Sequence, residues 1–372
     1  MNIEKLNQAR KRVRSFLLPN LVGIINENNA DYFIENRKEK SIKTIALVRS
    51  SLRLTQEIAP DLDRVIRSVC ERLQIERSFV DIYVFSSSDL NGFCFIDELP
   101  ITVGLSSLMV KSLKGDELAF VLGHEIGHAL FKETAYFVVN KDCLEDQIFA
   151  RSIELSVDRI GLLASNSCDA SFRAILKTLS GLDDSMLRYD FSHFMSEARE
   201  VLNTKIIEQH LYSSHPPLAQ RFKALVSFST SDVYLALTCG NSKGSIPIEQ
   251  VNKVITDGLT KGVDAKANDI IRKSLEDLSI WIVCFLIISK KTFSLSSLKR
   301  SCDLVINKCD VEKAVTFLDS YSMKEKVTVL NEKIQQCLID CFKLAPRATM
   351  KLINKFESFY PDVKFNPLED RK

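Results

Sequence analysis

Two histidines and a glutamate lie close together in the run His124-Glu125-Ile126-Gly127-His128. On an α-helix, residues four positions apart lie one turn apart on the same face, so both imidazoles can reach one metal ion. Glu125 projects from a neighbouring row, where it is badly placed to be a third ligand but well placed to take a proton from a water beside the metal. The run therefore predicts a hydrolytic zinc site with Glu125 as its base.

A second predicted helix, around residues 147–162, carries two further carboxylates, Glu154 and Asp158. They share one face, and the apolar residues around them place that face in the interior. Buried carboxylates need partners. Zinc would satisfy Glu154, and an imidazole N–H would satisfy Asp158, which would then fix the tautomer of a ligand histidine. The alternative is two solvated acids on an ordinary helix, which the upstream histidine pair disfavours.

His124, His128 and Glu154 together supply the three protein ligands that a hydrolytic zinc site needs, with a fourth position left for water. Zinc lowers the pKa of such a water from about 16 to near 7 and polarises a substrate carbonyl. Glu125 would accept the proton as the water attacks and deliver it to the departing amine. Acid and base catalysis of this kind is worth roughly 10²- to 10⁴-fold in rate.

The segments before the motif change from a helical to a strand pattern. Residues 61–73, after Pro60, have apolar residues at three and four spacing, which predicts an amphipathic helix. Residues 80–85 alternate and are rich in β-forming residues, and residues 93–96 and 101–103 are two shorter strand candidates. A small sheet of about three strands is therefore expected beside the motif helix.

The motif helix is predicted to begin near Asp116, whose carboxylate can cap the free amides of the first turn, and to run to Phe131. Gly123 and Gly127 lie inside it, and each costs about 1 kcal/mol relative to alanine. We expect this row of glycines to let the sheet or a substrate backbone come close, unless the glycines are simply tolerated.

The rest of the chain has a helical pattern with one marked break. His215 stands before Pro216 and Pro217, in an extended and rigid context, and a new helix begins after the prolines. From about Ser229 onward only helical periodicity is present. These patterns predict three parts: an N-terminal helical region at 1–59, a zinc metallopeptidase domain at 60–228 and a C-terminal helical domain at 229–372.

Composition narrows the class of protein. The chain has 372 residues, of which 45% are hydrophobic and 26% charged, enough for a sizeable core. Its 50 basic and 48 acidic side chains give a net charge of +2 without a basic stripe, so no nucleic-acid partner is expected. The apolar run 16–18 is too short for a secretory signal. Residues 280–288 span about half a bilayer, which favours a buried helix over an interfacial membrane segment.

Ten cysteines are scattered along the chain without a CxxC pair. Cys337 and Cys341 lie one helical turn apart and could hold a metal, but a role as small buried hydrophobic residues is the simpler interpretation. With no export signal, disulfides are not expected. A cytoplasmic location is expected instead.

Taken together, these blocks resemble the HtpX and CAAX-prenyl-protease family of zinc metallopeptidases, within the gluzincin group. The resemblance covers about residues 60 to 228. It rests on four blocks that occur in the order of the family: 101–108, 117–128, 154–159 and 215–221. The HExxH run alone is a common pattern, whereas all four blocks in sequence are specific.

The resemblance implies a peptidase whose zinc is held by His124, His128 and Glu154, with Glu125 catalytic. It also implies that His215 or Arg221 orients the glutamate ligand or steadies the oxyanion. Family members bind substrate as an added strand along the sheet edge, which here would be the stretch 91–96, with Asn91, Gly92 and Phe93 as substrate-binding residues.

This chain departs from the family in three respects. The link of 26 positions from His128 to Glu154 is short and leaves little room for an inserted lid. The chain has no spanning helices, so cleavage of membrane proteins or prenylated tails is not expected. Ser156 stands where alanine is more usual, a mild change that removes no ligand.

The sequence thus predicts a mainly helical α+β protein, with a zincin-like (gluzincin) core, a small sheet beside the HExxH helix and an appended all-helical domain. Its expected activity is that of a zinc-dependent metalloendopeptidase acting on a protein or peptide substrate. The alternative is a zinc-stabilised adaptor, chaperone or regulatory protein that binds a protein partner through residues 229–372. Glu125 favours the enzyme, since a scaffold has no need for a base beside its metal.

Overall fold

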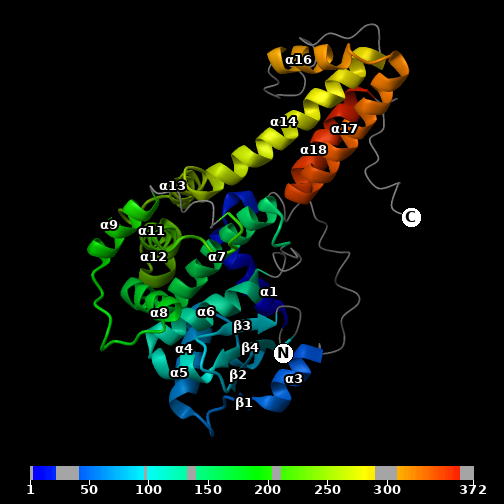
Figure 1. The fold of residues 1–372 in the computed structure, drawn as a ribbon. Helices are drawn as coiled ribbons and strands as arrows, with labels where there is room; N and C mark the ends of the chain where they lie inside the picture. Colours follow the sequence, from blue (N-terminus) through cyan, green and yellow to red (C-terminus); the bar gives the residue numbers. More distant parts are fainter. Residues whose placement is uncertain are drawn as a thin grey trace. The chain divides into compact units, whose positions relative to one another are not determined.

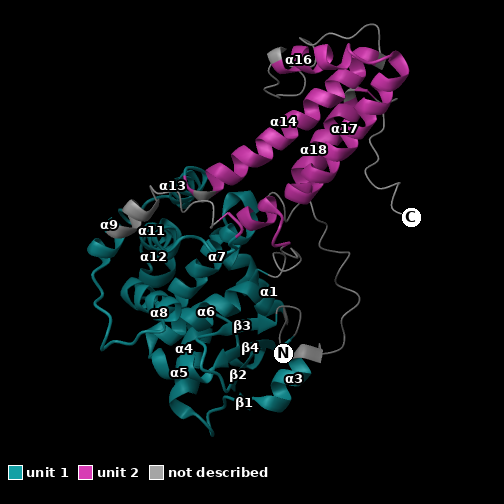
Figure 2. Cartoon of the chain, viewed as in Figure 1, with its two compact units in different colours: residues 1–138, 149–206, 213–261 teal, residues 139–148, 207–212, 262–372 magenta. Residues whose placement is uncertain are grey.

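The computed structural model describes residues 3–21, 42–95, 99–131, 140–202, 211–289 and 308–360. The chain forms two compact units, shown in different colours in Figure 2. The first unit contains residues 1–138, 149–206 and 213–261, and the second contains residues 139–148, 207–212 and 262–372.

The first unit is mainly helical, with one small sheet (Figure 1). Its helices are α1 (Ile3–Val13), α3 (Ile42–Ser50), α4 (Pro60–Leu73), α5 (Ser107–Ser112), α6 (Asp116–Leu130), α7 (Leu144–Ser165), α8 (Cys168–Ser180), α9 (Phe191–Leu202), α11 (Leu218–Ser229), α12 (Asp232–Cys239) and α13 (Ile248–Thr260). The first residues of α7, up to 148, are assigned to the second unit. Two short 3₁₀ helices are η1 (Arg14–Phe16) and η3 (Arg77–Phe79).

Four strands form the sheet in the order β1-β2-β4-β3. They are β1 (Leu52–Arg53), β2 (Val80–Phe85), β3 (Gly92–Phe95) and β4 (Ile101–Ser106). β2 and β4 run parallel, and the outer strands pair antiparallel to them. β3 is therefore an edge strand, and α6 packs against β3 and β4.

The three predicted strands are present as β2, β3 and β4, although position 96 lies outside the described residues. β1 was not predicted, because it is only two residues long and both of its side chains are exposed. β4 is buried along its whole length, as expected for a strand paired on both sides and covered by helices. The mainly helical fold with a small sheet beside the motif helix is confirmed.

α6 begins where the sequence predicts it, but no side chain caps its first turn. Gly115 is the N-cap, and Asp116 lies inside the helix, paired with Arg72 at 3.1 Å. Glu117 instead accepts a hydrogen bond from the Lys114 backbone N–H at 3.2 Å. The predicted cap by Asp116 was wrong because Gly115 occupies the N-cap position and Asp116 is the first residue of the helix.

The glycines of the motif helix pack against another helix. A Cβ atom on Gly123 would lie 2.3 Å from the Cβ of Ala164, and one on Gly127 would lie 3.2 Å from the Cβ of Ile160, both on α7. On the α7 side, Gly161 faces the backbone oxygen of Phe120. The prediction that the sheet or a substrate approaches these glycines was wrong, since α7 occupies the space. The close crossing brings the two chemistry-bearing helices together.

We expect Gly123→Ala to destabilise the protein although alanine favours a helix, because the added methyl group overlaps Ala164. Overpacking of this kind costs about 1 to 3 kcal/mol, measurable by urea unfolding. Gly258 is the control: it lies within α13 with open space around its Cβ position. Gly258→Ala should raise stability by up to about 1 kcal/mol, and a Gly123→Ala protein as stable as the wild type would contradict the close crossing.

The second unit is all-helical in the residues described. Its elements are α14 (Val263–Ser289), α16 (Lys308–Leu318), α17 (Met323–Leu344) and α18 (Pro346–Phe359). The apolar stretch 280–288 lies in α14, where Ile282, Val283 and Leu286 are buried in the core of this unit. Among the described residues, the structure contains no helix that is both long and apolar enough to cross a membrane.

Cys337 and Cys341 both lie on α17. The buried Cys341 donates its Sγ–H to the Ser274 backbone oxygen at 3.2 Å, and both thiols are free. The residues described in the structure group neither cysteine with further metal-ligating side chains. This arrangement agrees with the interpretation as buried small side chains.

The compact units do not coincide with the predicted domain boundaries. α12 and α13 bury Tyr234, Val251 and Ile255 in the core of the first unit, which therefore extends to 261 and not to 228. α1 also contributes Leu6 and Val13 to that core, although the sequence assigned it to a separate region. Helical periodicity shows that a helix has an apolar face but not which core that face joins. The predicted functional division of the chain stays a prediction.

Candidate active site

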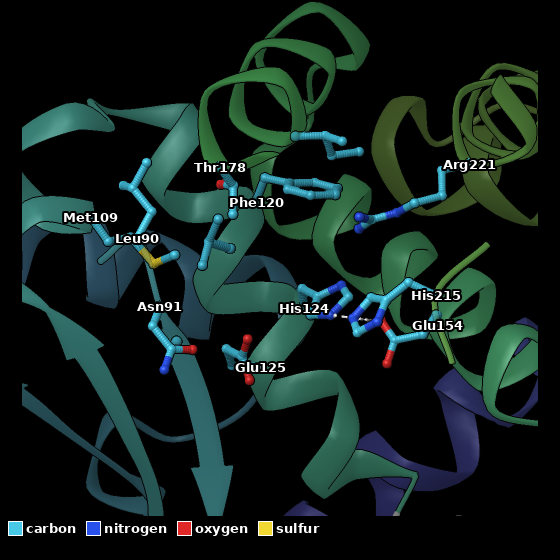
Figure 3. Close-up of a pocket in the computed structure, with 13 residues that line it drawn as sticks. Leu90, Asn91, Met109, Phe120, His124, Glu125, Glu154, Thr178, His215 and Arg221 are labelled. Atoms are coloured by element: carbon cyan, nitrogen blue, oxygen red, sulfur yellow. Dashed lines mark ion pairs between the residues drawn. The ribbon is translucent and has the colours of Figure 1, made fainter. Parts of the chain in front are cut away.

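Apart from the predicted substrate-binding stretch, the predicted site residues come from three helices and one loop of the first unit. Figure 3 shows those of them that line the cavity. α6 supplies His124, Glu125 and His128, and α7 supplies Glu154 and Asp158. His215 lies on the loop before α11, and Arg221 lies on α11 itself. Segments up to about 100 positions apart in sequence thus meet at the crossing of α6 and α7.

The structure brings the three predicted zinc ligands together. Candidate ligand atoms of His124, His128 and Glu154 all lie within 4.8 Å of one another. His124 Nε2 is 3.4 Å from Glu154 Oε2, and His128 Nε2 is 3.8 Å from Glu154 Oε1. Two imidazole nitrogens and one carboxylate oxygen form a donor set that suits zinc.

The carboxylate of Glu154 also fits a metal. Its Oε2 atom is buried and has no hydrogen-bond partner among the described residues. Burial alone would raise the pKa of Glu154, but the neighbouring His124 and His128 outweigh it and hold the pKa well below its usual range. A buried anion without a hydrogen bond to this oxygen needs a cation, and zinc held by the three side chains would supply it.

Asp158 is fully buried and joins His124 to Arg221. Its Oδ1 accepts the Nδ1–H of His124 at 2.9 Å, and Arg221 donates two hydrogen bonds to the same carboxylate, at 2.7 and 2.8 Å. Burial opposes ionisation of Asp158, but Arg221 lowers its pKa. The charged carboxylate therefore holds the Nδ1 proton of His124, which leaves Nε2 as the nitrogen that would bind a metal.

The two histidines differ in their protonation. Burial lowers the pKa of His124, but the hydrogen bond to Asp158 and the nearby Glu154 carboxylate outweigh burial and raise it to about 10. Burial lowers the pKa of His128 to about 4, so this imidazole is neutral. Zinc binding would therefore displace a proton from His124 and find His128 ready to coordinate.

Glu125 is directed away from His124 and Glu154 and towards the edge strand (Figure 3). A Cβ atom on Gly92 of β3 would lie 3.3 Å from Glu125 Oε1, so the carboxylate lies directly against that strand. Burial raises the pKa of Glu125 to about 7. A carboxyl group with such a pKa can both take up and release a proton near neutral pH, as a general base and acid must.

A cavity of about 180 Å³ opens over Glu125 and His124. It is lined by residues from β3 and the loop before it, from α5 to α8, and from the His215 loop and α11: Leu90, Asn91, Gly92, Met109, Phe120, Val121, His124, Glu125, Glu154, Ile175, Thr178, His215 and Arg221. The predicted substrate-binding residues Asn91 and Gly92 are among them.

Phe93, the third predicted substrate-binding residue, does not line the cavity. Its ring covers Gly104, its partner on β4, and neighbouring residues of a strand point to opposite faces of the sheet. Because Gly92 faces Glu125, the Phe93 side chain lies on the far face. Only the backbone of Phe93 remains available to a substrate at this edge.

The sequence predictions missed most of the apolar cavity wall. Phe120 and Val121 lie one turn before His124 and Glu125, so the helical period of α6 could have shown that they share the site face. Ile175 and Thr178 belong to α8, and no local pattern in that helix indicates which residues meet the site.

His215 and Arg221 take different positions around Glu154 and Asp158. His215 is 63% exposed and its Nε2 lies 3.6 Å from Glu154 Oε2. Arg221 is mostly buried and is held by Asp158. His215 is thus an accessible group at the rim, whereas Arg221 acts on the ligands through Asp158.

Comparison with known protein families supports this site. Residues 56–150 match the model described as peptidase family M48, a family of zinc metallopeptidases. The matched segment carries three of the four strands, β2, β3 and β4, and the whole of α6, and it ends before Glu154. The resemblance found in the sequence is thereby shown for this segment. Searches of curated proteins and of solved structures gave no match.

Proposed function

We propose that the protein is a zinc-dependent endopeptidase, with His124, His128 and Glu154 as the ligands and Glu125 as the catalytic base. One observation carries this proposal: the partly buried Glu125 carboxylate stands beside the ligand cluster, at the cavity and against an edge strand. A metal site that only stabilises a fold needs no free carboxylate at this position.

Zinc, when bound, would supply Lewis acidity and a more acidic water. Glu125 would take the proton of the attacking water and pass it to the nitrogen of the departing amine. Asp158 and Arg221 hold His124 in its ligating tautomer throughout. His215, exposed at the cavity rim, is the group placed to donate a hydrogen bond to the negative oxygen that develops on the carbonyl.

The edge strand offers a binding mode for an extended peptide. β3 pairs with β4 on one side and is the last strand of the described sheet, so its other edge can accept a further strand. Gly92 has no side chain to separate such a strand from Glu125. A bound peptide would thereby present one of its bonds to the base and the ligands.

The cavity wall favours an apolar substrate side chain. Leu90, Met109, Phe120, Val121 and Ile175 contribute apolar groups to it. Desolvating a charged side chain against such a wall is costly. We therefore propose that peptides with an apolar residue beside the cleaved bond are the preferred substrates.

Thr178 offers a way to change this preference, because it lines the cavity on α8 and is only half-buried. Thr178→Lys would place a cation in the wall, and we expect the kcat/KM ratio of apolar over acidic substrates to fall about tenfold or more. Leu179→Lys is the matched control, since Leu179 is 60% exposed on the same helix and does not line the cavity. Identical selectivity of the two variants would contradict the assigned cavity.

Digestion of a peptide library by the full chain tests the proposed function. We expect cleavage that stops when zinc is removed with a chelator and returns when zinc is restored. The alternative function, a zinc-stabilised adaptor or regulatory protein, predicts zinc binding with no cleaved peptide under any of these conditions. A cytoplasmic location and a protein partner for the C-terminal residues stay predictions.

A further inference from the structure

A short N-terminal segment, Arg14–Leu21, is packed into the interior beside the ligand helix. It consists of η1 and the five residues that follow, and Phe16, Leu17, Leu18 and Leu21 are at most 3% exposed. In Figure 1 the dark blue N-terminal chain passes beside α7. The segment lies outside the part of the chain that matches the peptidase family, which begins at residue 56.

Three polar contacts attach this N-terminal segment to α7. The Leu18 backbone N–H donates to Ser156 Oγ at 3.2 Å, and Asn20 Nδ2 donates to Ser152 Oγ at 2.8 Å. The buried Arg159 guanidinium donates to the Phe16 backbone oxygen at 2.9 Å. All three α7 residues are fully buried, so these bonds form away from water, where an unpaired group is costly.

The attachment points and the site residues lie on opposite sides of α7. Successive residues of an α-helix are rotated by about 100°, so Ser152, Ser156 and Arg159 share one face. By the same geometry Glu154 and Asp158 lie on the reverse face, roughly 150° away. A rotation of α7 that loosened the N-terminal segment would therefore also move both carboxylates.

Ser156 gives this arrangement a specific sequence signature. A side chain without a hydroxyl at this position, such as that of alanine, would have no group to accept the Leu18 N–H. Here the hydroxyl accepts that N–H and donates to the Ser152 backbone oxygen at 2.8 Å. The Ser156 hydroxyl thus joins the N-terminal segment to the backbone of α7.

We infer that the N-terminal segment is a positioning element for the proposed zinc site: bonded to Ser152 and Ser156, it fixes the rotation of α7 and so the places of Glu154 and Asp158. Ser152 and Ser156 are positioning residues, since neither faces the cavity. The inference rests on the proposed function for the identity of the metal. Displacing the segment would weaken the site without removing a ligand.

Zinc affinity of the full-length chain, measured by competition with a chromophoric chelator, tests the inference. Residues that orient a ligand typically contribute 10- to 100-fold to metal affinity, and these serines act one contact further away. We therefore expect Ser156→Ala to raise the zinc dissociation constant about 3- to 10-fold. Cleavage lost at limiting zinc should return when zinc is in excess.

Ser171→Ala is the matched control for a buried serine. Ser171 is fully buried on α8 and donates to the Ser167 backbone oxygen, as Ser156 does to Ser152. Its hydroxyl bonds Ser167 and, at 2.9 Å, Ser165 at the end of α7, and neither residue belongs to the N-terminal segment. Replacement of Ser171 should therefore lower thermal stability without changing zinc affinity. Equal weakening of zinc binding by both serine variants would overturn the inference, because any loss of stability would then produce the effect.

The Asn20 bond supplies a second test that does not depend on Ser156→Ala folding well. If the Asn20 to Ser152 hydrogen bond positions α7, then Asn20→Ala, Ser152→Ala and the double variant should weaken zinc binding by the same factor. Asn20→Ala and Ser156→Ala could instead lower only the unfolding temperature and bind zinc as tightly as the wild type. That result would overturn the inference and leave the proposed function intact. A wild-type chain that bound no zinc would overturn both.

Discussion

Replacing Glu125 by glutamine is expected to abolish peptide cleavage while zinc remains bound. Glutamine keeps the size of the side chain but cannot accept a proton, and Glu125 is not among the clustered ligands. The loss of a general base predicts a fall of roughly 10²- to 10⁴-fold in kcat. Cleavage rates measured on samples of equal zinc content give the answer.

Glu71→Gln is the control for this substitution. Glu71 lies on the exposed face of α4, so the same chemical change there should leave both zinc content and cleavage unaltered. Full proteolysis by zinc-loaded Glu125→Gln would show that another group, or none, serves as the base. The proposed mechanism would then be wrong, whatever the ligands are.

Replacing Glu154 by alanine is expected to have the largest effect on zinc itself. The variant would leave two histidines and remove the anion nearest to them, because Glu154 approaches both imidazoles. Loss of a group that only orients a ligand typically weakens metal binding 10- to 100-fold. Because Glu154 is itself one of three protein ligands, we expect its loss to raise the zinc dissociation constant by more than that. A competition titration on the folded protein measures it.

Asp158→Asn provides the graded comparison. Asparagine keeps the shape of the side chain but loses the charge that fixes His124 and pairs with Arg221. Zinc affinity should therefore fall about 10- to 100-fold, less than in Glu154→Ala. Undiminished zinc affinity in Glu154→Ala, or a larger loss in Asp158→Asn, would contradict the assignment of Glu154 as the third ligand.

The parts of the site that were predictable depend on local periodicity. His124 and His128 belong to one helical turn, and Glu154 and Asp158 to one face of another helix, so their types and spacing predict that each pair acts together. Buried carboxylates also indicate the need for a cation and for an N–H donor. The structure places these four side chains within reach of one another.

The parts that could not be predicted depend on which surfaces pack together. Gly123 was expected to make room for the sheet or a substrate, but the neighbouring group is Ala164 of another helix. Ile175 and Thr178 face the cavity only because of how α8 packs, and the N-terminal segment reaches Ser156 from 138 positions away. Contacts of this kind arise from tertiary packing, which leaves no periodic signal in the sequence.

The second unit has a core of its own but no assigned role. Its helices α14, α16, α17 and α18 bury a separate apolar cluster, and the metal-ligand cluster found among the described residues lies in the first unit. Binding of a protein partner by the C-terminal residues remains the prediction made from the sequence. Partner binding and catalysis can therefore be tested on separate groups of residues.

Cleavage measured as a function of bound zinc tests the central claim most directly. Zinc is titrated into the chelator-treated full chain, and bound metal and the initial rate of peptide cleavage are followed in the same samples. The account predicts a rate that rises in proportion to bound zinc and levels off at one zinc per chain. One zinc per chain bound at the His124, His128 and Glu154 cluster, with no peptide bond cleaved, would contradict it.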